Sequence, residues 1–139
     1  MRILVPVDGS AGALRAVRHA AAVVKEGAEV ELVNVQPPMP LYGMVRAYMR
    51  APQYRAACAA LAEKALNPAI KLLKRARVAH RAHVIYGEPG VVLADAARRL
   101  KCRAIVMGTR GQGAVGNLLL GSVATKVIHL AKVPVTLVK

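Results

Sequence analysis

The residue types best suited to binding an anion lie in the stretch 108–122, GTRGQGAVGNLLLGS, which contains five glycines in fifteen residues. It follows an apolar run at residues 104–107 and precedes a helical pattern that starts at Val123. A strand that leads through a glycine-rich loop into a helix N-terminus presents unpaired backbone N–H groups and the positive end of the helix dipole. The stretch is therefore predicted to bind phosphate.

Two common nucleotide motifs fit this stretch poorly. Residues 111–116 match G-x-G-x-x-G, but the acidic residue that binds a ribose about 20 positions later is absent. Residues 116–122 have the glycine spacing of a P-loop, but its lysine is missing and three leucines occupy the loop. Neither a dinucleotide site nor a P-loop is predicted.

The elements that must position this loop alternate between strand and helix along the whole chain, residues 1–139. Apolar or β-rich runs predict strands at residues 3–7, 28–35, 78–86, 104–107 and 133–138, and helical spacing predicts helices from Ser10, over 53–75, from Pro89 and from Val123. We expect strand pairing to fail near Pro6, and Pro68 to kink or interrupt its helix. That helix is expected to place Cys58, Leu61, Ala65, Ala69 and Leu72 on one inner stripe. Residues 36–50 are expected to form a long loop. The pattern predicts a single α/β domain with an open five-stranded parallel sheet covered on both faces.

The first and fourth strands have the most continuous apolar runs and are expected to be central neighbours, whereas His80, Arg81 and His83 place the third strand at an edge. Ligands bind such sheets beyond the carboxyl ends of the strands, where the strand order reverses. Asp8 and Gly108 should therefore face one crevice.

Composition limits the possible function. The chain has 55% hydrophobic residues, no Phe or Trp, and a net charge of +14, with no acidic residue after Asp95. This charge favours polyanions, so binding of RNA or DNA is an alternative to a solvated basic surface. Cys58 and Cys102 are too few for a disulfide framework, and no apolar run approaches a membrane span. A cytoplasmic protein that does not bind membranes is expected.

One further spacing joins Gly108, Gly111, Gly121 and Ser122 as G-x2-G-x9-G-[ST]. With it, the segments ILVPVDGS, VNV, GEP, IVMGTRG, GSVATKV and VPVTLVK resemble the universal stress protein family over the whole chain. The resemblance implies a Rossmann-like fold of the adenine nucleotide alpha hydrolase type, with strand order 3-2-1-4-5. It also implies an ATP-binding member of the family, a small cytoplasmic dimer that acts in stress resistance.

The resemblance assigns roles to particular residues. Asp8 and the backbone of Val35 should hold the adenosine, Gly108 and Gly111 should let backbone approach the ribose and phosphates, and the helix start should bind phosphate oxygens. The full predicted nucleotide-binding set is Pro6, Val7, Asp8, Val35, Met107, Gly108, Arg110, Gly111, Gly113, Gly121, Ser122 and Val123. Asp8 could also help hold a phosphate-bound Mg²⁺. Two structural alternatives stay open: a simple turn and helix cap at residues 8–10, and glycines that serve backbone packing alone.

Binding is expected rather than dedicated catalysis, because only Asp8 lies near the predicted phosphates and no residues have metal-ligand spacing. The leading hypothesis is an ATP-binding regulatory module, with a polyanion-binding protein and a slow ATPase as alternatives. The last strand, from Val133 to Val138, is apolar and needs a partner if it forms an edge. The resemblance implies that it pairs with its copy in a homodimer.

Overall fold

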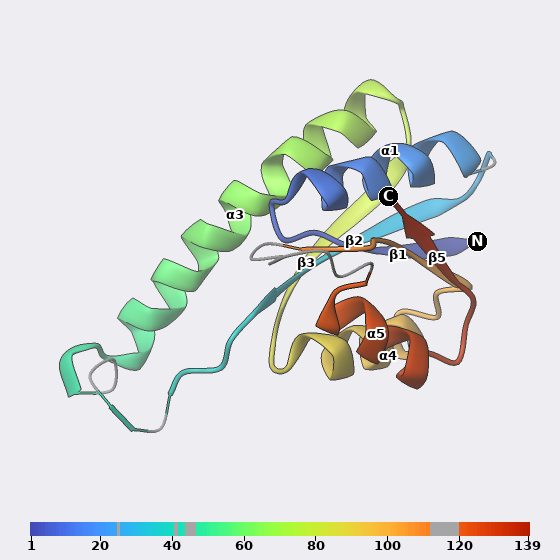
Figure 1. Cartoon of the computed structure of the whole chain (residues 1–139). Helices are drawn as coiled ribbons and strands as arrows, with labels where there is room; N and C mark the ends of the chain where they lie inside the picture. Colours follow the sequence, from blue (N-terminus) through green and yellow to red (C-terminus); the bar gives the residue numbers. More distant parts are fainter. Residues whose placement is uncertain (25, 41, 44–46, 112–119) are drawn as a thin grey trace.

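The computed structural model describes residues 1–24, 26–40, 42–43, 47–111 and 120–139. Strands and helices alternate as expected, and α3 is much the longest helix (Figure 1). The elements are β1 (Arg2–Pro6), α1 (Ala11–Val23), β2 (Glu29–Gln36), α3 (Ala51–Arg75), β3 (Ala79–Tyr86), α4 (Pro89–Arg99), β4 (Ala104–Gly108), α5 (Ser122–Leu130) and β5 (Val135–Val138).

All five strands form one parallel sheet in the order β3-β2-β1-β4-β5, which confirms the predicted topology. Helices α1 and α3 lie on one face of the sheet, and α4 and α5 on the other (Figure 1). Because β1 has β2 on one side and β4 on the other, the strand order reverses between β1 and β4. This is where a ligand crevice is expected in such a sheet.

Two aliphatic clusters form the core, one on each face of the sheet. Alternate residues of β1 divide between them: Ile3 and Val5 pack toward α1 and α3, and Leu4 packs toward α4 and α5. Leu4 and Val5 are completely buried. A strand that is buried on both faces needs the continuous apolar run that the sequence shows.

Pro6 has different effects on its two neighbouring strands. The pairing of β1 with β2 continues through Pro6 and Val33, and the Val7 N–H then donates to the Val33 carbonyl at 2.8 Å. Toward β4 the register ends two residues earlier, at Leu4 and Ile105. The expected loss of pairing near Pro6 therefore occurs on the β4 side, and there the two strands part.

Helix α3 corrects two local predictions. It continues without interruption through Pro68, whose exposed position lets water reach the carbonyl that lacks a helical partner. Leu61, expected on the inner stripe, is 60% exposed, while Cys58, Ala62 and Ala65 are buried. No helix in the described part of the chain is long and apolar enough to cross a membrane.

Candidate functional site

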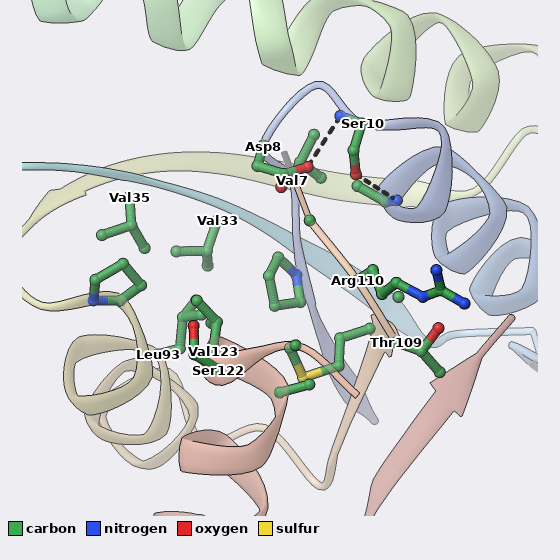
Figure 2. Close-up of a pocket in the computed structure, with 18 residues that line it drawn as sticks. Val7, Asp8, Ser10, Val33, Val35, Leu93, Thr109, Arg110, Ser122 and Val123 are labelled. Atoms are coloured by element: carbon green, nitrogen blue, oxygen red, sulfur yellow. Dashed lines mark hydrogen bonds between the residues drawn. The ribbon is translucent and has the colours of Figure 1, made fainter. Parts of the chain in front are cut away.

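A cavity of about 430 Å³ opens where β1 and β4 part. It lies beyond the carboxyl ends of these strands, and α4 and α5 contribute to its wall (Figure 2). Asp8 and Gly108 both line it, as the sequence predicts. Residues a hundred positions apart in the sequence thus share one site.

Every predicted binding residue that the structure describes lines this cavity. These residues are Pro6, Val7, Asp8, Val35, Met107, Gly108, Arg110, Gly111, Gly121, Ser122 and Val123. Gly113 lies outside the described residues. Seven further residues that were not predicted from the sequence also line the cavity: Ser10, Ala13, Val33, Pro89, Leu93, Thr109 and Ala124.

The missed residues differ in how far the sequence could have indicated them. Val33 lies two positions before Val35 on β2, so the strand period alone places both side chains on the same face. Thr109 and Ala124 neighbour predicted residues, and Ser10 lies two positions after Asp8. Pro89 and Leu93 come from α4, and no motif in the sequence indicates that this helix covers the cavity.

One wall of the cavity is apolar. The side chains of Val33 and Val35 lie near those of Leu93 and Val123, which come from α4 and α5 (Figure 2). Pro89 extends the same wall. Aliphatic side chains at this density suit a flat, weakly polar group such as a nucleobase.

The turn after β1 fixes Asp8 at the rim. The Ser10 N–H donates to Asp8 Oδ1 at 2.9 Å, and Ser10 Oγ accepts from the Ala13 N–H at 3.1 Å as the N-cap of α1. Gly9 has φ 85°, a conformation that favours glycine. The turn-and-cap interpretation of residues 8–10 is therefore correct, and it also places the carboxylate at the cavity.

Buried amides hold the same turn from the other face of the sheet. Asn34 Nδ2 donates to the Val7 carbonyl at 2.7 Å, and Gln36 Nε2 donates to Asn34 Oδ1 at 2.7 Å. Asn34 is 3% exposed and Gln36 8% exposed, so water cannot easily replace these bonds. Asn34 thus fixes the backbone immediately before Asp8.

The glycines at the site have different roles. A Cβ on Gly108 would lie 2.9 Å from the Gly12 carbonyl carbon, so this glycine lets α1 approach β4. A Cβ on Gly111 would overlap the Asp8 carboxylate. Glycine at position 108 therefore permits tight backbone packing, and glycine at position 111 leaves room for the Asp8 carboxylate.

Helix α5 begins at the cavity without a side-chain cap. Its N-cap is Gly121, which accepts the Thr125 N–H on its carbonyl and donates its own N–H to the Thr109 carbonyl at 2.8 Å. By contrast, Ser10 caps α1 and Glu88 caps α4 with their side chains. The first turn of α5, which includes Ser122 and Val123, thus presents its N–H groups and positive dipole end at the cavity.

Charged groups of both signs lie at or near the site. Arg110 lines the cavity, and Asp8 is the one carboxylate among its described lining residues. At the start of α4, desolvation acts to raise the pKa of Glu88, but the Val91 N–H and Lys126 lower it overall. Lys126 Nζ lies 3.2 Å from Glu88 Oε2, which ties α5 to α4.

Known proteins resemble this chain over its full length. The universal stress protein from the QAH/OAS sulfhydrylase 3' region of Thermus aquaticus is 35% identical over 146 residues, covering 99% of this chain and 97% of the relative. Universal stress protein MJ0531 of Methanocaldococcus jannaschii is 32% identical, covering 99% of this chain and 81% of the relative.

A solved structure agrees with these relatives. The universal stress protein of Archaeoglobus fulgidus in complex with dAMP is 26% identical, with a TM-score of 0.73 over 100% of this chain and 98% of that chain. The model of the universal stress protein family matches residues 1–139. The chain, with its five-stranded parallel sheet and its crevice between β1 and β4, therefore belongs to the universal stress protein family.

Proposed function

We propose that this protein is an ATP-binding regulatory module of the stress response, and that ATP binds in the cavity between β1 and β4. The observation that carries the proposal is one cavity that combines an aliphatic wall at Val33, Val35 and Leu93 with the uncapped N-terminus of α5. The wall suits adenine, and the helix N-terminus suits phosphates. The dAMP complex of the Archaeoglobus relative supports an adenine nucleotide.

Individual residues would bind different parts of the nucleotide. Asp8 would accept hydrogen bonds from ribose hydroxyls or help hold a phosphate-bound Mg²⁺. The backbone N–H groups of Ser122 and Val123 would donate to phosphate oxygens, and the guanidinium of Arg110 would add a charge-assisted contact. The spacing of Gly108, Gly111, Gly121 and Ser122 supports ATP as the physiological nucleotide.

Binding rather than efficient turnover is proposed. Phosphoryl transfer needs a positioned nucleophile and metal-holding carboxylates. Asp8 is the only carboxylate that the described part of the cavity offers, and no group of three metal ligands occurs among the described residues. Any hydrolysis should therefore be slow, and phosphate release indistinguishable from that of a Ser122→Ala variant would agree with this.

Calorimetry with ATP tests the proposed site. Wild-type protein should bind ATP, Asp8→Ala should bind it more weakly, and Gly121→Val should bind weakest because a branched side chain would block the start of α5. No heat at millimolar ATP would contradict the proposal. So would equal affinity for all three proteins.

We also propose a homodimer formed through β5, in the cytoplasm. Strand β5 lies at the edge of the sheet beside β4, and Val135, Leu137 and Val138 are only partly buried. Pairing with a second copy would protect this edge. Light scattering should give twice the 14.7 kDa chain mass, whereas a single-chain mass at high protein concentration would contradict the dimer.

Cys58 and Cys102 are unpaired, which fits a reducing compartment.

A further inference from the structure

A second, strongly basic depression lies at the amino-terminal edge of the sheet. Met1, Arg2, Arg99, Lys101 and Arg103 line it, so four of its five residues are cationic. Arg2 is the first residue of β1, whereas Asp8 follows the end of that strand. The depression and the nucleotide cavity therefore lie at opposite ends of the sheet.

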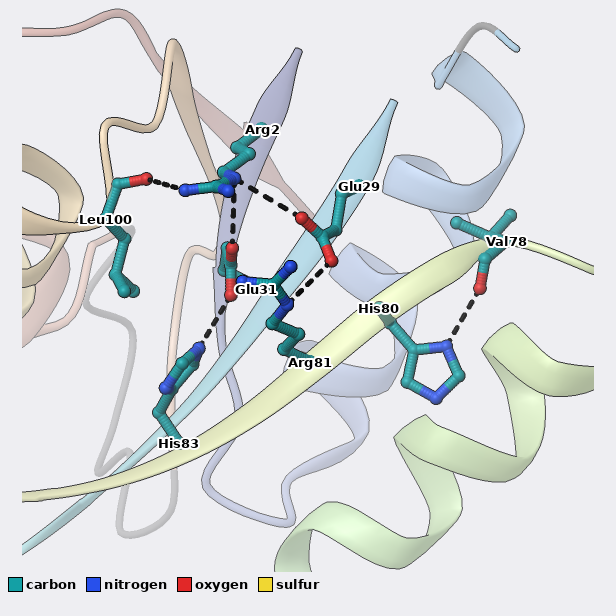
Figure 3. Close-up of polar contacts among 8 residues, drawn as sticks. All are labelled: Arg2, Glu29, Glu31, Val78, His80, Arg81, His83 and Leu100. Carbon is teal, nitrogen blue, oxygen red and sulfur yellow. Dashed lines mark hydrogen bonds and ion pairs between the residues drawn. The ribbon is translucent and has the colours of Figure 1, made fainter. Parts of the chain in front are cut away.

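Two of these cations are held in place by acidic residues. Arg2 Nε lies 3.3 Å from Glu29 and 3.5 Å from the buried Glu31, and Arg2 Nη1 donates to the Leu100 carbonyl at 3.1 Å (Figure 3). Arg99 Nε lies 2.8 Å from Asp95. These guanidinium groups are oriented before any ligand arrives, which reduces the entropy lost on binding.

The other two cations are not compensated. Lys101 and Arg103 are exposed, and neither forms an ion pair with a described acidic residue. The Arg103 N–H donates to the Arg2 carbonyl at 2.8 Å, which places their backbones side by side. The depression therefore carries a net positive charge at its rim.

Two basic residues at this edge, Arg77 and Lys101, share an uncommon backbone conformation. Among the described residues other than glycine, only Arg77 and Lys101 have positive φ, at 56° and 54°. Each lies in the short turn between a helix and the following strand, where glycine would adopt this conformation at lower cost. In both turns the backbone N–H groups bond back to the preceding helix: Lys101 N–H to the Arg98 carbonyl and Cys102 N–H to the Ala97 carbonyl, with the equivalent bonds at Arg77 and Val78. This helix C-cap accounts for the positive φ values and places both basic residues at the same edge of the sheet.

Basic residues precede or begin four of the five strands at this edge, whereas β2 begins with Glu29, which pairs with Arg2 and Arg81. Arg77 precedes β3, Arg2 begins β1, Lys101 and Arg103 precede β4, and Lys132 precedes β5. Neighbouring strands are about 4.8 Å apart, so the five-stranded edge extends about 20 Å. A row of this length can contact several phosphates of a linear polyanion.

We propose that this edge binds the sugar–phosphate backbone of nucleic acid, centred on Lys101 and Arg103. The depression lacks aromatic side chains on which bases could stack, so its contacts would be made to phosphates and would tolerate any base sequence. The site is separate from the nucleotide cavity, and its occupancy does not depend on ATP.

Fluorescence anisotropy with a labelled 20-nucleotide RNA of mixed sequence tests the proposal, over a series of salt concentrations. The variant Lys101→Gln/Arg103→Gln should bind at least about tenfold more weakly at 50 mM salt, and its salt slope should fall by about 1.4, which corresponds to two lost phosphate contacts. The matched control Arg55→Gln/Lys64→Gln removes one arginine and one lysine from exposed positions of α3. It should change both quantities much less.

Three results would overturn the proposal. Wild type could fail to bind RNA at low salt, or both double variants could lose equal affinity, which would show a response to net charge alone. Inorganic tripolyphosphate could compete as strongly per phosphate as RNA, which would indicate a small-anion site instead. Circular dichroism and the unfolding midpoint should be unchanged in both variants. Lys101→Gly removes one cation at a position whose positive φ suits glycine, so it provides a second variant that keeps the fold.

Discussion

The carboxylate of Asp8 occupies the space where a side chain at Gly111 would lie, because a Cβ built on Gly111 would overlap Asp8 Oδ2. Asp8 follows β1 and Gly111 follows β4, so the segments after two neighbouring strands meet at the cavity. Gly111 does not have positive φ, so its role comes from space rather than from backbone conformation.

Gly111→Ala should therefore weaken ATP binding about tenfold, a free-energy change of about 1.4 kcal/mol, by displacing the Asp8 carboxylate. Calorimetry checks this. In an Asp8→Ala background, which removes the overlapping group, the same substitution should have little further effect. Additive losses in the double variant would show that Gly111 acts independently of Asp8.

Gly108→Ala should affect folding rather than binding alone. The added Cβ would meet the backbone of Gly12, at 2.9 Å from its carbonyl carbon and 3.0 Å from its oxygen, and would force α1 away from β4. Overpacking of this kind costs about 1–3 kcal/mol in the free energy of unfolding, measurable with urea. Gly111→Ala is the matched control, because its new methyl group meets a side chain that can move. Equal destabilisation by both would contradict the assignment.

Asn34→Leu should lower stability and weaken ATP binding together. The Val7 carbonyl would lose its donor and Gln36 its acceptor, a change that costs about 1–3 kcal/mol for buried groups. Asn67→Leu, at an exposed position of α3, is the control and should be close to neutral. If Asn34→Leu kept wild-type ATP affinity at full occupancy of the folded state, Asn34 would not position Asp8.

Cys102 should make stability depend on pH in the alkaline range. Burial, reinforced by Glu31, raises the pKa of this thiol to about 11 from 9.0. The folded state therefore keeps the proton that the unfolded state loses first, so stability is complete below pH 9 and falls between pH 9 and 11. Unfolding by urea at pH 8 and pH 10.5 should show a larger loss in wild type than in Cys102→Ala. A loss of equal size in both would assign the effect to other groups.

The pairing of β1 with β4 and the meeting of Asp8 with Gly108 could be predicted because they follow from strong signals: two continuous apolar strands and the rule for parallel sheets. The complete strand order was implied by the resemblance to the family. The packing of α4 could not be predicted. Pro89 and Leu93 line the cavity because α4 crosses its wall, and a helix pattern specifies an inner face without specifying which part of the sheet it covers. Leu61 was wrong for a related reason: Cys58, Ala65 and Ala69 of the predicted α3 stripe are buried, but Leu61 faces solvent.

Two further predictions from local sequence did not foresee the effects of solvent exposure and tertiary contact. Pro68 was expected to kink or interrupt α3, but the helix continues through it; Pro68 lies on the exposed side, where the carbonyl that loses its helical partner is open to water. At Gly108 the sequence indicated a role toward the ligand, and the close approach of Gly12 depends on a tertiary contact that no local pattern contains.

The most direct test of ATP binding in the cavity between β1 and β4 is an amide NMR titration that compares ATP with adenosine. ATP should shift the N–H resonances of Ser122, Val123 and Ala124 at the start of α5 together with those of Val33 and Val35, because phosphates and base occupy one cavity. Adenosine should shift Val33 and Val35 while leaving the α5 amides nearly unchanged. If the shifts with ATP avoid the start of α5, or if the α5 shifts are equal with both ligands, the phosphates do not bind at the N-terminus of α5.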